Sequence, residues 1–148
     1  MEYNYIKKIT NHIQKYIKGL YIVGSIRRKE ELVNDIDFVT KKDLPILLEE
    51  FASLYDIVVN TLGEKYTSFT LSSDHFKIEV NIWKANDEYE YVQNKILRTL
   101  DKGHYIGLRK LANNKGLKLT EQGLYDTTNK HYIHFKNKKE LLKLLKLN

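Results

Sequence analysis

The sequence contains no cysteine, which excludes disulfide bonds and zinc sites built on thiolates. Proline occurs once, and there is no internal repeat, low-complexity segment or long linker. No stretch approaches the ~20 consecutive apolar residues that a membrane-spanning helix needs. The first ten residues carry charge and no long apolar run, so they do not resemble a signal peptide. We therefore expect a cytoplasmic protein without a membrane partner, or, if viral, one in the host cytoplasm or the virion.

The composition is that of a globular protein with a distinctly basic C-terminal part. The chain has 148 residues, of which 42% are hydrophobic and 30% charged, enough for one domain or two small lobes. Its net charge is +6. Residues 95–148 hold 13 Lys and Arg against 4 Asp and Glu, whereas residues 1–94 hold 12 against 15. The basic part suggests a polyanionic partner, although a solvated lysine-rich surface has the same composition.

Hydrophobic periodicity predicts an α+β fold. We predict helices at 5–18, 41–55, 88–100, 105–114 and 135–147. We predict strands at 20–23, 36–39, 56–61, 66–72 and 76–83, and a short hairpin within 117–125. These elements suggest a lobe with a mixed β-sheet and flanking helices at 1–85. A smaller, mostly helical lobe would follow at 86–148.

Two acids on one predicted strand are the first candidate site residues. Asp35 and Asp37 are two positions apart, so their side chains point to the same side of the strand. Two carboxylates this close repel each other unless a cation lies between them. Glu79 stands on the polar face of strand 76–83, and the three acids converge if that strand lies beside the first.

Three carboxylates without histidine or cysteine favour Mg²⁺, with Mn²⁺ also suitable, over Zn²⁺. Two such ions would activate an attacking hydroxyl group and stabilise a leaving pyrophosphate. The pattern Asp-x-Asp alone is common, and most copies of it are solvated turns. The acids therefore need a second feature before they indicate a nucleotide site.

The turn before the acids supplies that feature. Gly24 follows a predicted strand, and Ser25 begins a possible short helix whose backbone N–H groups would bind phosphate. Arg28 offers a forked donor to phosphate oxygens, although it could instead pair with Glu30 or Glu31. An anion-binding turn about ten residues before a metal-binding pair is the arrangement that holds a metal-bound triphosphate.

The segment VGSIRRKEELVNDIDFV resembles the nucleotide-binding segment of the family X DNA polymerases, the polymerase beta type of the nucleotidyltransferase superfamily. FKIEVNIW resembles the strand that carries the third metal-binding acid of that family. LRKLANNKGLKLTEQGLY and YIHFKNKKELLKLLKL resemble its C-terminal motifs. The resemblance covers roughly residues 20–148. The chain lacks a counterpart to the N-terminal lyase domain, as in the reduced viral members, which consist of palm and C-terminal subdomain only.

This resemblance implies a role for each matching residue. Asp35 and Asp37 would bind both catalytic metals, and Glu79 would hold the catalytic metal where the family usually has Asp. The implied nucleotide-binding residues are Gly24, Ser25, Arg28 and Asn34. The implied DNA-binding residues are Arg109, near the templating base, and Lys110, Lys115 and Lys118. Glu121 would help to position the segment that carries Arg109.

The resemblance implies a nucleotidyltransferase palm at 1–85 and a basic fingers or thumb subdomain at 86–148. It implies a monomeric, template-directed DNA polymerase that adds a dNTP to a primer 3′-hydroxyl on gapped or primer-template DNA, with short-gap filling in DNA repair as its role. Two alternatives remain open. One is a template-independent nucleotidyltransferase. The other is a catalytically inactive DNA-binding module, because residues 97–100 and Tyr105 also depart from the family pattern.

Overall fold

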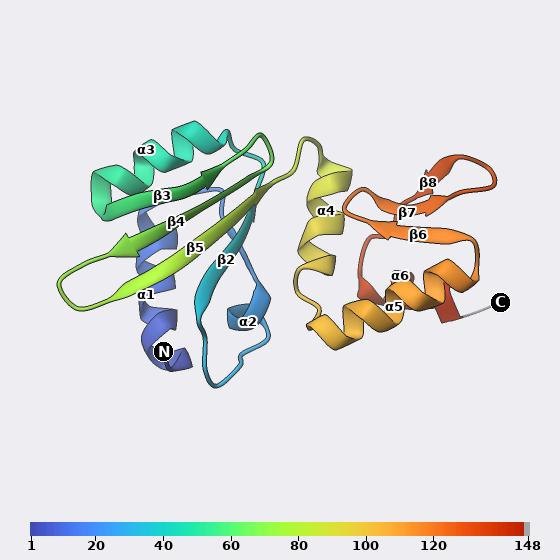
Figure 1. Ribbon diagram of the computed structural model, residues 1–148, viewed down its shortest axis with the longest axis horizontal. Coiled ribbons are helices and arrows are strands. Elements are labelled where there is room, and N and C mark those ends of the chain that lie inside the picture. Colours follow the sequence, from blue (N-terminus) through green and yellow to red (C-terminus); the bar gives the residue numbers. More distant parts are fainter. Residues whose placement is uncertain (147–148) are drawn as a thin grey trace. The chain divides into compact units, whose positions relative to one another are not determined.

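The computed structural model describes residues 1–146, which divide into two compact units (Figure 1). Unit 1 comprises Met1–Ala85, and unit 2 begins at Asn86. Within the described residues, no helix combines the length and the apolar character that a bilayer span requires. Each unit has its own hydrophobic core, so each is described separately.

Unit 1 is a five-stranded mixed sheet with helices on one face. Its elements are α1 (Tyr3–Tyr16), β1 (Tyr21–Val23), α2 (Gly24–Arg27), β2 (Asp35–Thr40), α3 (Leu44–Leu54), β3 (Asp56–Leu62), β4 (Tyr66–Ser72) and β5 (Lys77–Lys84). The strand order is β1-β2-β5-β4-β3. Only β2 and β5 run parallel, and the other neighbouring strands are antiparallel. The two strands that carry the predicted acids are therefore adjacent.

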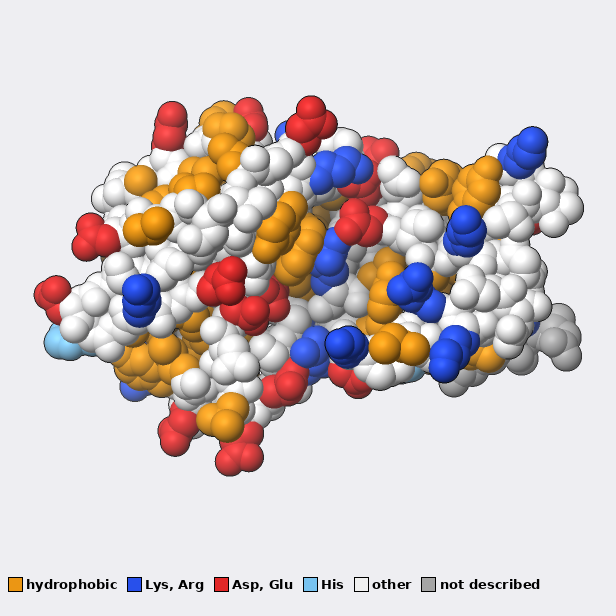
Figure 2. Space-filling view, viewed as in Figure 1, with side chains coloured by type: hydrophobic (Ala, Val, Ile, Leu, Met, Phe, Trp, Pro, Cys, Tyr) orange, Lys and Arg blue, Asp and Glu red, His pale blue; other side chains and the backbone are white. Residues whose placement is uncertain are grey.

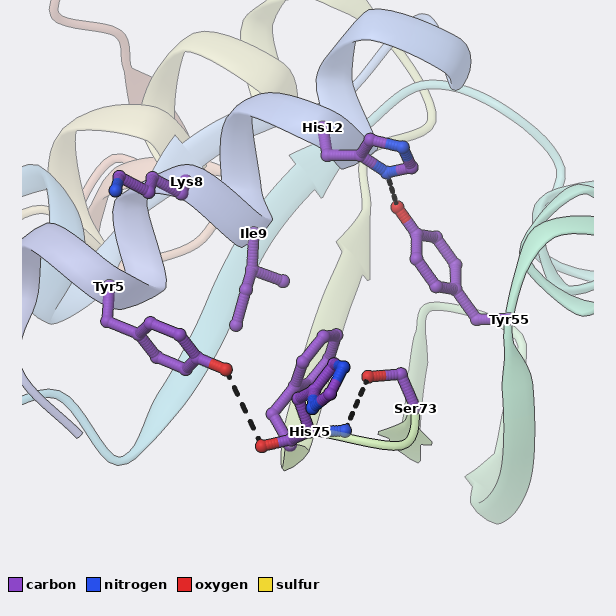
Figure 3. A pocket seen from close by; sticks show the side chains of 8 residues that line it. Tyr5, Lys8, Ile9, His12, Tyr55, Ser73 and His75 are labelled. Atoms are coloured by element: carbon purple, nitrogen blue, oxygen red, sulfur yellow. Dashed lines mark hydrogen bonds between the residues drawn. The ribbon is translucent and has the colours of Figure 1, made fainter.

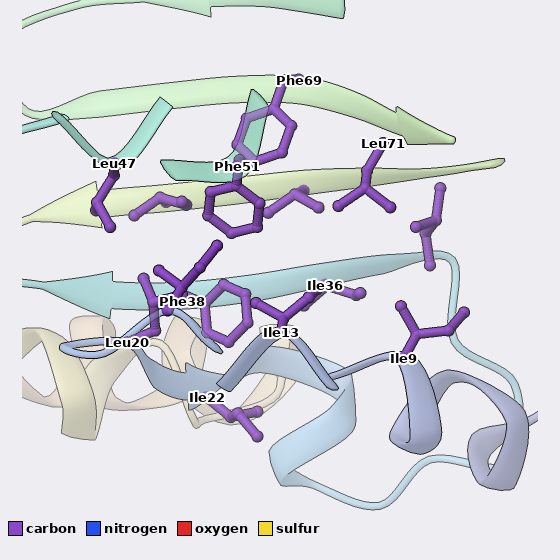
Figure 4. Close-up of a cluster of buried hydrophobic side chains, with 14 of the residues drawn as sticks. Ile9, Ile13, Leu20, Ile22, Ile36, Phe38, Leu47, Phe51, Phe69 and Leu71 are labelled. Carbon is purple, nitrogen blue, oxygen red and sulfur yellow. The ribbon is translucent and has the colours of Figure 1, made fainter. Parts of the chain in front are cut away.

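The core of unit 1 shows which face of the sheet the helices α1 and α3 cover and which face they leave uncovered. Ile36 and Phe38 of β2 and the alternate residues Val80 and Ile82 of β5 are fully buried beneath the helices (Figure 4). The same core includes Ile13 of α1 and residues of α3, so both helices cover one face. Because side chains alternate along a strand, the residues between these core positions point to the opposite, polar face.

Unit 2 combines three helices with a small antiparallel sheet. Its elements are α4 (Glu88–Leu97), α5 (Lys102–Asn114), β6 (Leu117–Thr120), β7 (Gly123–Asp126), β8 (His131–Ile133) and α6 (Lys138–Lys146). The sheet order is β6-β7-β8. Leu108, Leu124 and Leu141 are among the residues that form its core. Two helices begin at capping aspartates: Asp87 Oδ1 accepts a hydrogen bond from Glu90 N at 2.8 Å, and Asp101 Oδ1 accepts one from His104 N at 2.8 Å.

The predicted α+β architecture is confirmed, with two local differences. Every predicted helix and strand is present within residues 1–146, with ends shifted by a few residues. Residue 147, the predicted end of the last helix, lies outside the described residues. The helix predicted to continue to residue 100 ends at Leu97, and Arg98 is its C-cap. Strand β8 was missed, so the predicted hairpin is a three-stranded sheet. A strand of three residues has too few alternating positions to give a clear period of two.

Candidate active site

The two acids of β2 lie on the polar face of the unit 1 sheet, and acidic side chains gather over β2 and β5 in Figure 2. Asp35 and Asp37 are half-buried and alternate with the buried Ile36 and Phe38. The parallel register pairs Asp35 with Glu79 and Asp37 with Asn81. The predicted adjacency of the two strands is therefore confirmed.

Asn81 joins the two carboxylates. Its amide nitrogen Nδ2 donates to Asp37 Oδ1 at 3.0 Å and to Asp35 Oδ2 at 3.3 Å. Its amide oxygen accepts a hydrogen bond from the Tyr66 hydroxyl at 2.6 Å. Only 7% of the Asn81 surface is exposed, so its polar atoms depend on these partners. Asn81 is thus the side chain of β5 that contacts both acids.

Glu79, the third predicted acid, neighbours the pair on the adjacent strand. Glu79 is exposed, and its register position is opposite Asp35, at the beginning of β2. Among the described residues, no three His, Asp or Glu side chains lie together closely enough to hold a metal ion. The register thus puts Glu79 beside Asp35 and Asn81 beside Asp37, all on the polar face of the sheet.

Sequence reasoning missed Asn81, although the necessary signal was present. The alternation along β5 puts Asn81 on the same polar face as Glu79. Choosing between the two requires the strand register, because the Cα positions of residues two apart in a strand differ by about 6.6 Å. Glu79 was predicted as a metal ligand because a carboxylate is the more familiar ligand of Mg²⁺.

The turn at Gly24 lies directly against the acid pair. The register of β1 and β2 places Val23 opposite Asp37, and α2 begins at the next residue. Gly24 has a φ of +71°, and a Cβ atom built on it would lie 2.2 Å from Asp37 Oδ2. Only glycine meets both requirements, because an L-residue disfavours this φ and its methyl group would overlap the carboxylate. The sequence predicted that the turn and the acid pair act together, and the structure places Gly24 against Asp37.

The other predicted nucleotide-binding residues surround this turn. Arg28 is the C-cap of α2 and forms an ion pair with Glu30, with an Nη2–Oε2 distance of 2.6 Å. This pairing is one of the two alternatives that the sequence allowed for Arg28. Ser25 is half-buried in α2, and Asn34 is exposed immediately before β2.

Burial raises the pKa of Asp35 above its ordinary value. Hydrogen bonds with Asp37 and Asn81 and the positive charge of Arg28 act in the opposite direction and lower this pKa, but they do not cancel the effect of burial. The ionised form of Asp35 is therefore disfavoured in the protein alone. A cation between the two carboxylates would remove this penalty.

The donor set at this site suits a hard divalent cation. Asp35 and Asp37 supply carboxylate oxygens, and Glu79 stands opposite Asp35. The amide of Asn81 presents its NH₂ group to the pair and its oxygen to Tyr66. Carboxylate, amide carbonyl and water oxygens are the ligands that Mg²⁺ and Mn²⁺ accept. The residues therefore fit such an ion.

The predicted DNA-binding residues are all exposed on unit 2. Arg109 and Lys110 lie on α5, Lys115 is the C-cap of that helix and Lys118 lies on β6. Figure 2 shows Lys and Arg side chains over α5 and β6. The guanidinium carbon of Arg109 lies 5.8 Å from the centre of the Tyr105 ring, within the range of a cation–π contact.

Comparisons with known proteins agree with this architecture. Residues 96–148 match the family model of the DNA polymerase beta thumb. The structure is similar to that of Leishmania infantum polymerase beta in a ternary P/T complex, with a TM-score of 0.82 and 14% sequence identity over 100% of this chain and 73% of that chain. A search of curated proteins found no match.

The chain has the fold of polymerase beta. The expected family X resemblance is therefore confirmed at the level of the fold, and residues 96–148 are thumb-like in sequence as well. Within this polymerase beta-like fold, the acid pair belongs to the sheet of unit 1 and the thumb-like segment to unit 2.

Arg98 and Glu121 connect two parts of the thumb-like segment. They form an ion pair, and Arg98 Nε also donates to Asn94 Oδ1 at 2.9 Å. Leu97 and Leu100 on either side are buried in the core of unit 2. The sequence predicted that Glu121 positions the segment carrying Arg109, and the partner that the structure identifies for Glu121 is Arg98.

A cavity of about 340 Å³ lies elsewhere in unit 1, between α1 and the turn that joins β4 to β5 (Figure 3). The Tyr5 hydroxyl donates to the backbone oxygen of His75 at 3.5 Å, and His12 is hydrogen-bonded to Tyr55. The lining includes no acidic side chain, so this cavity is separate from the acid pair.

Proposed function

We propose that this chain is a template-directed DNA polymerase that adds a dNTP to a primer 3′-hydroxyl on gapped or primer-template DNA. The observation that supports this proposal most strongly is the contact between Asp37, one of the two acids of β2, and the Gly24 turn within a polymerase beta-like fold. Filling of short gaps during DNA repair is the role that we propose for this activity.

In this proposal, Asp35 and Asp37 hold two Mg²⁺ or Mn²⁺ ions, with Glu79, opposite Asp35 on β5, as the third carboxylate. When bound, these ions would promote attack by the primer hydroxyl group and offset the charge on the leaving pyrophosphate. The first N–H groups of α2 and the Ser25 hydroxyl would donate to the triphosphate, because the first N–H groups of a helix lack acceptors within the helix. Arg28 would exchange Glu30 for a phosphate oxygen. The chain would act as a monomer.

The exposed cations of unit 2 would bind the DNA backbone, so affinity for DNA should depend steeply on salt. Going from about 50 to about 200 mM salt should weaken binding at least roughly tenfold, because each neutralised phosphate releases counterions. Exchanging Lys110, Lys115 and Lys118 together for glutamine should weaken binding at low salt and flatten the slope of log affinity against log salt. Fluorescence anisotropy with a labelled primer-template DNA measures both quantities.

The matched control exchanges three exposed lysines of unit 1, Lys8, Lys15 and Lys18, for glutamine. This variant has the same net charge as the unit 2 variant, and its salt slope should equal that of the original protein. Equal slopes in all three proteins would show that unit 2 does not supply the phosphate contacts.

A catalytically inactive DNA-binding module is the second candidate function. The specific observation in its favour is that the NH₂ group of Asn81, a neutral side chain, bridges both acids at the place where a cation would lie. Such a module would bind DNA with the same salt dependence but would incorporate no nucleotide.

Primer extension on four templates that differ in the first unpaired base distinguishes these functions. The polymerase proposal predicts Mg²⁺-dependent addition of the complementary nucleotide on each template. Addition that ignores the template would indicate a template-independent nucleotidyltransferase. No incorporation with either Mg²⁺ or Mn²⁺, together with retained DNA binding, would indicate the inactive module.

A further inference from the structure

The amide of Asn81 occupies the place between the carboxylates where a cation would be stabilised. Its Nδ2 group carries the partial positive charge that both Asp35 and Asp37 approach, at 3.3 and 3.0 Å. The amide oxygen faces the Tyr66 hydroxyl at 2.6 Å. This orientation is the favourable one without a metal, because the opposite orientation would aim the amide oxygen at two carboxylates.

We propose that Asn81 is a reversible ligand of the metal site. Without a metal, its NH₂ group bridges the two carboxylates; with a divalent cation bound, the amide turns over and directs its oxygen to the cation. This inference rests on the metal site in the proposed function and identifies a residue that regulates how tightly the site holds an ion.

Tyr66 makes both orientations of the amide possible. A phenol hydroxyl can donate a hydrogen bond and can also accept one. Tyr66 therefore donates to the amide oxygen in the metal-free protein and would accept from the NH₂ group after the amide turns over. Tyr66 is half-buried and lies beside Trp83, with ring centres 5.3 Å apart, so its ring has a defined position in either state.

A neutral ligand at position 81 should make metal binding weaker than an acid at that position would. The cation must displace two hydrogen bonds of Asn81, and the amide contributes no negative charge. Since the affinity of oxygen-ligand sites rises with the number of charged ligands, an acid at position 81 should tighten binding. The same acid would repel Asp35 and Asp37 in the metal-free protein, so the variant should also gain more stability from the metal.

The test is Mn²⁺ binding measured by electron paramagnetic resonance, without DNA or nucleotide. Asn81→Asp should bind Mn²⁺ at least about tenfold more tightly than the original protein. The control is Asn60→Asp, which adds the same charge on β3, where Asn60 donates to Thr70 Oγ1 at 3.2 Å. The control should leave the affinity unchanged within about twofold, because β3 is the far edge of the sheet from β2.

A second measurement on the unaltered protein follows the amide itself, and it remains valid if Asn81→Asp fails to fold. In a ¹⁵N–¹H spectrum, the Asn81 side-chain NH₂ signals should shift strongly when Mg²⁺ is added, while those of Asn60 stay in place. Mg²⁺ binding that leaves the Asn81 signals unchanged would overturn the inference.

The outcomes separate this inference from the proposed function. If the original protein binds Mn²⁺ and Asn81→Asp binds it no more tightly, the role of Asn81 is wrong but the metal site stands. If binding tightens without any nucleotide incorporation, the inference stands and the polymerase proposal fails. If neither protein binds Mn²⁺, the proposed role of Asn81 and the metal site of the proposed function are both wrong.

Discussion

Replacing Asp37 with alanine should lower Mg²⁺-dependent nucleotide incorporation by at least about 100-fold. The substitution removes a carboxylate that would hold both ions, and a metal ion contributes several kcal/mol to stabilising the charge of the transition state. A loss of about 3 kcal/mol corresponds to roughly 100-fold in rate. Single-turnover primer extension measures this rate without a contribution from product release.

Three further variants sharpen this prediction. Asp35→Ala should be equally impaired, and the double variant should be little worse than either single one, because the two acids act as a unit. Asp56→Ala should retain full activity, since Asp56 is an exposed acid at the start of the edge strand β3. An Asp37→Ala protein with more than a tenth of the original rate would contradict the role of the pair.

Replacing Gly24 with alanine should impair incorporation as severely as removing Asp37. The new methyl group would lie 2.2 Å from Asp37 Oδ2, so the carboxylate must move. A displacement of about 1 Å in a reacting site can cost roughly 100-fold in rate. The φ of +71° should also destabilise the folded protein by about 1–2 kcal/mol. Primer extension and thermal unfolding measure the two effects.

Gly19→Ala is the matched control for this prediction. Gly19 has a φ of +84°, and its new methyl group would meet Cδ of Lys42 at 2.6 Å, which is a side chain outside the acid pair. The control should lose similar stability but keep its rate below the unfolding transition. If both variants lose the same fraction of activity, instability alone explains the effect, and the contact between Gly24 and Asp37 is not needed for function.

The helices and strands of unit 1 could be predicted because hydrophobic alternation and turn residues can be read within short stretches of the sequence. Alternation along β5 identified the buried positions Ile78, Val80 and Ile82 and assigned Glu79 and Asn81 to the polar face. The Gly-Ser turn after a short apolar strand indicated a short helix from Ser25, and α2 begins one residue earlier, at Gly24. These features depend on residues within a few positions of each other.

The composition of the site could not be predicted in the same way. The register of two parallel strands separated by about 40 residues depends on how their core faces pack beneath the helices. That packing placed Asn81 beside Asp37 and left Glu79 exposed. In unit 2, the partner of Glu121 was missed for a similar reason, because the ion pair with Arg98 joins residues 23 positions apart.

The measurement that tests the central claim most directly is anomalous diffraction from a crystal containing Mn²⁺ and a nonhydrolysable dNTP. The account predicts an anomalous peak within bonding distance of carboxylate oxygens of both Asp35 and Asp37, with the triphosphate against the turn at Gly24 and Ser25. A crystal with ordered nucleotide but no peak at the two aspartates, or with the ion held elsewhere, would contradict it.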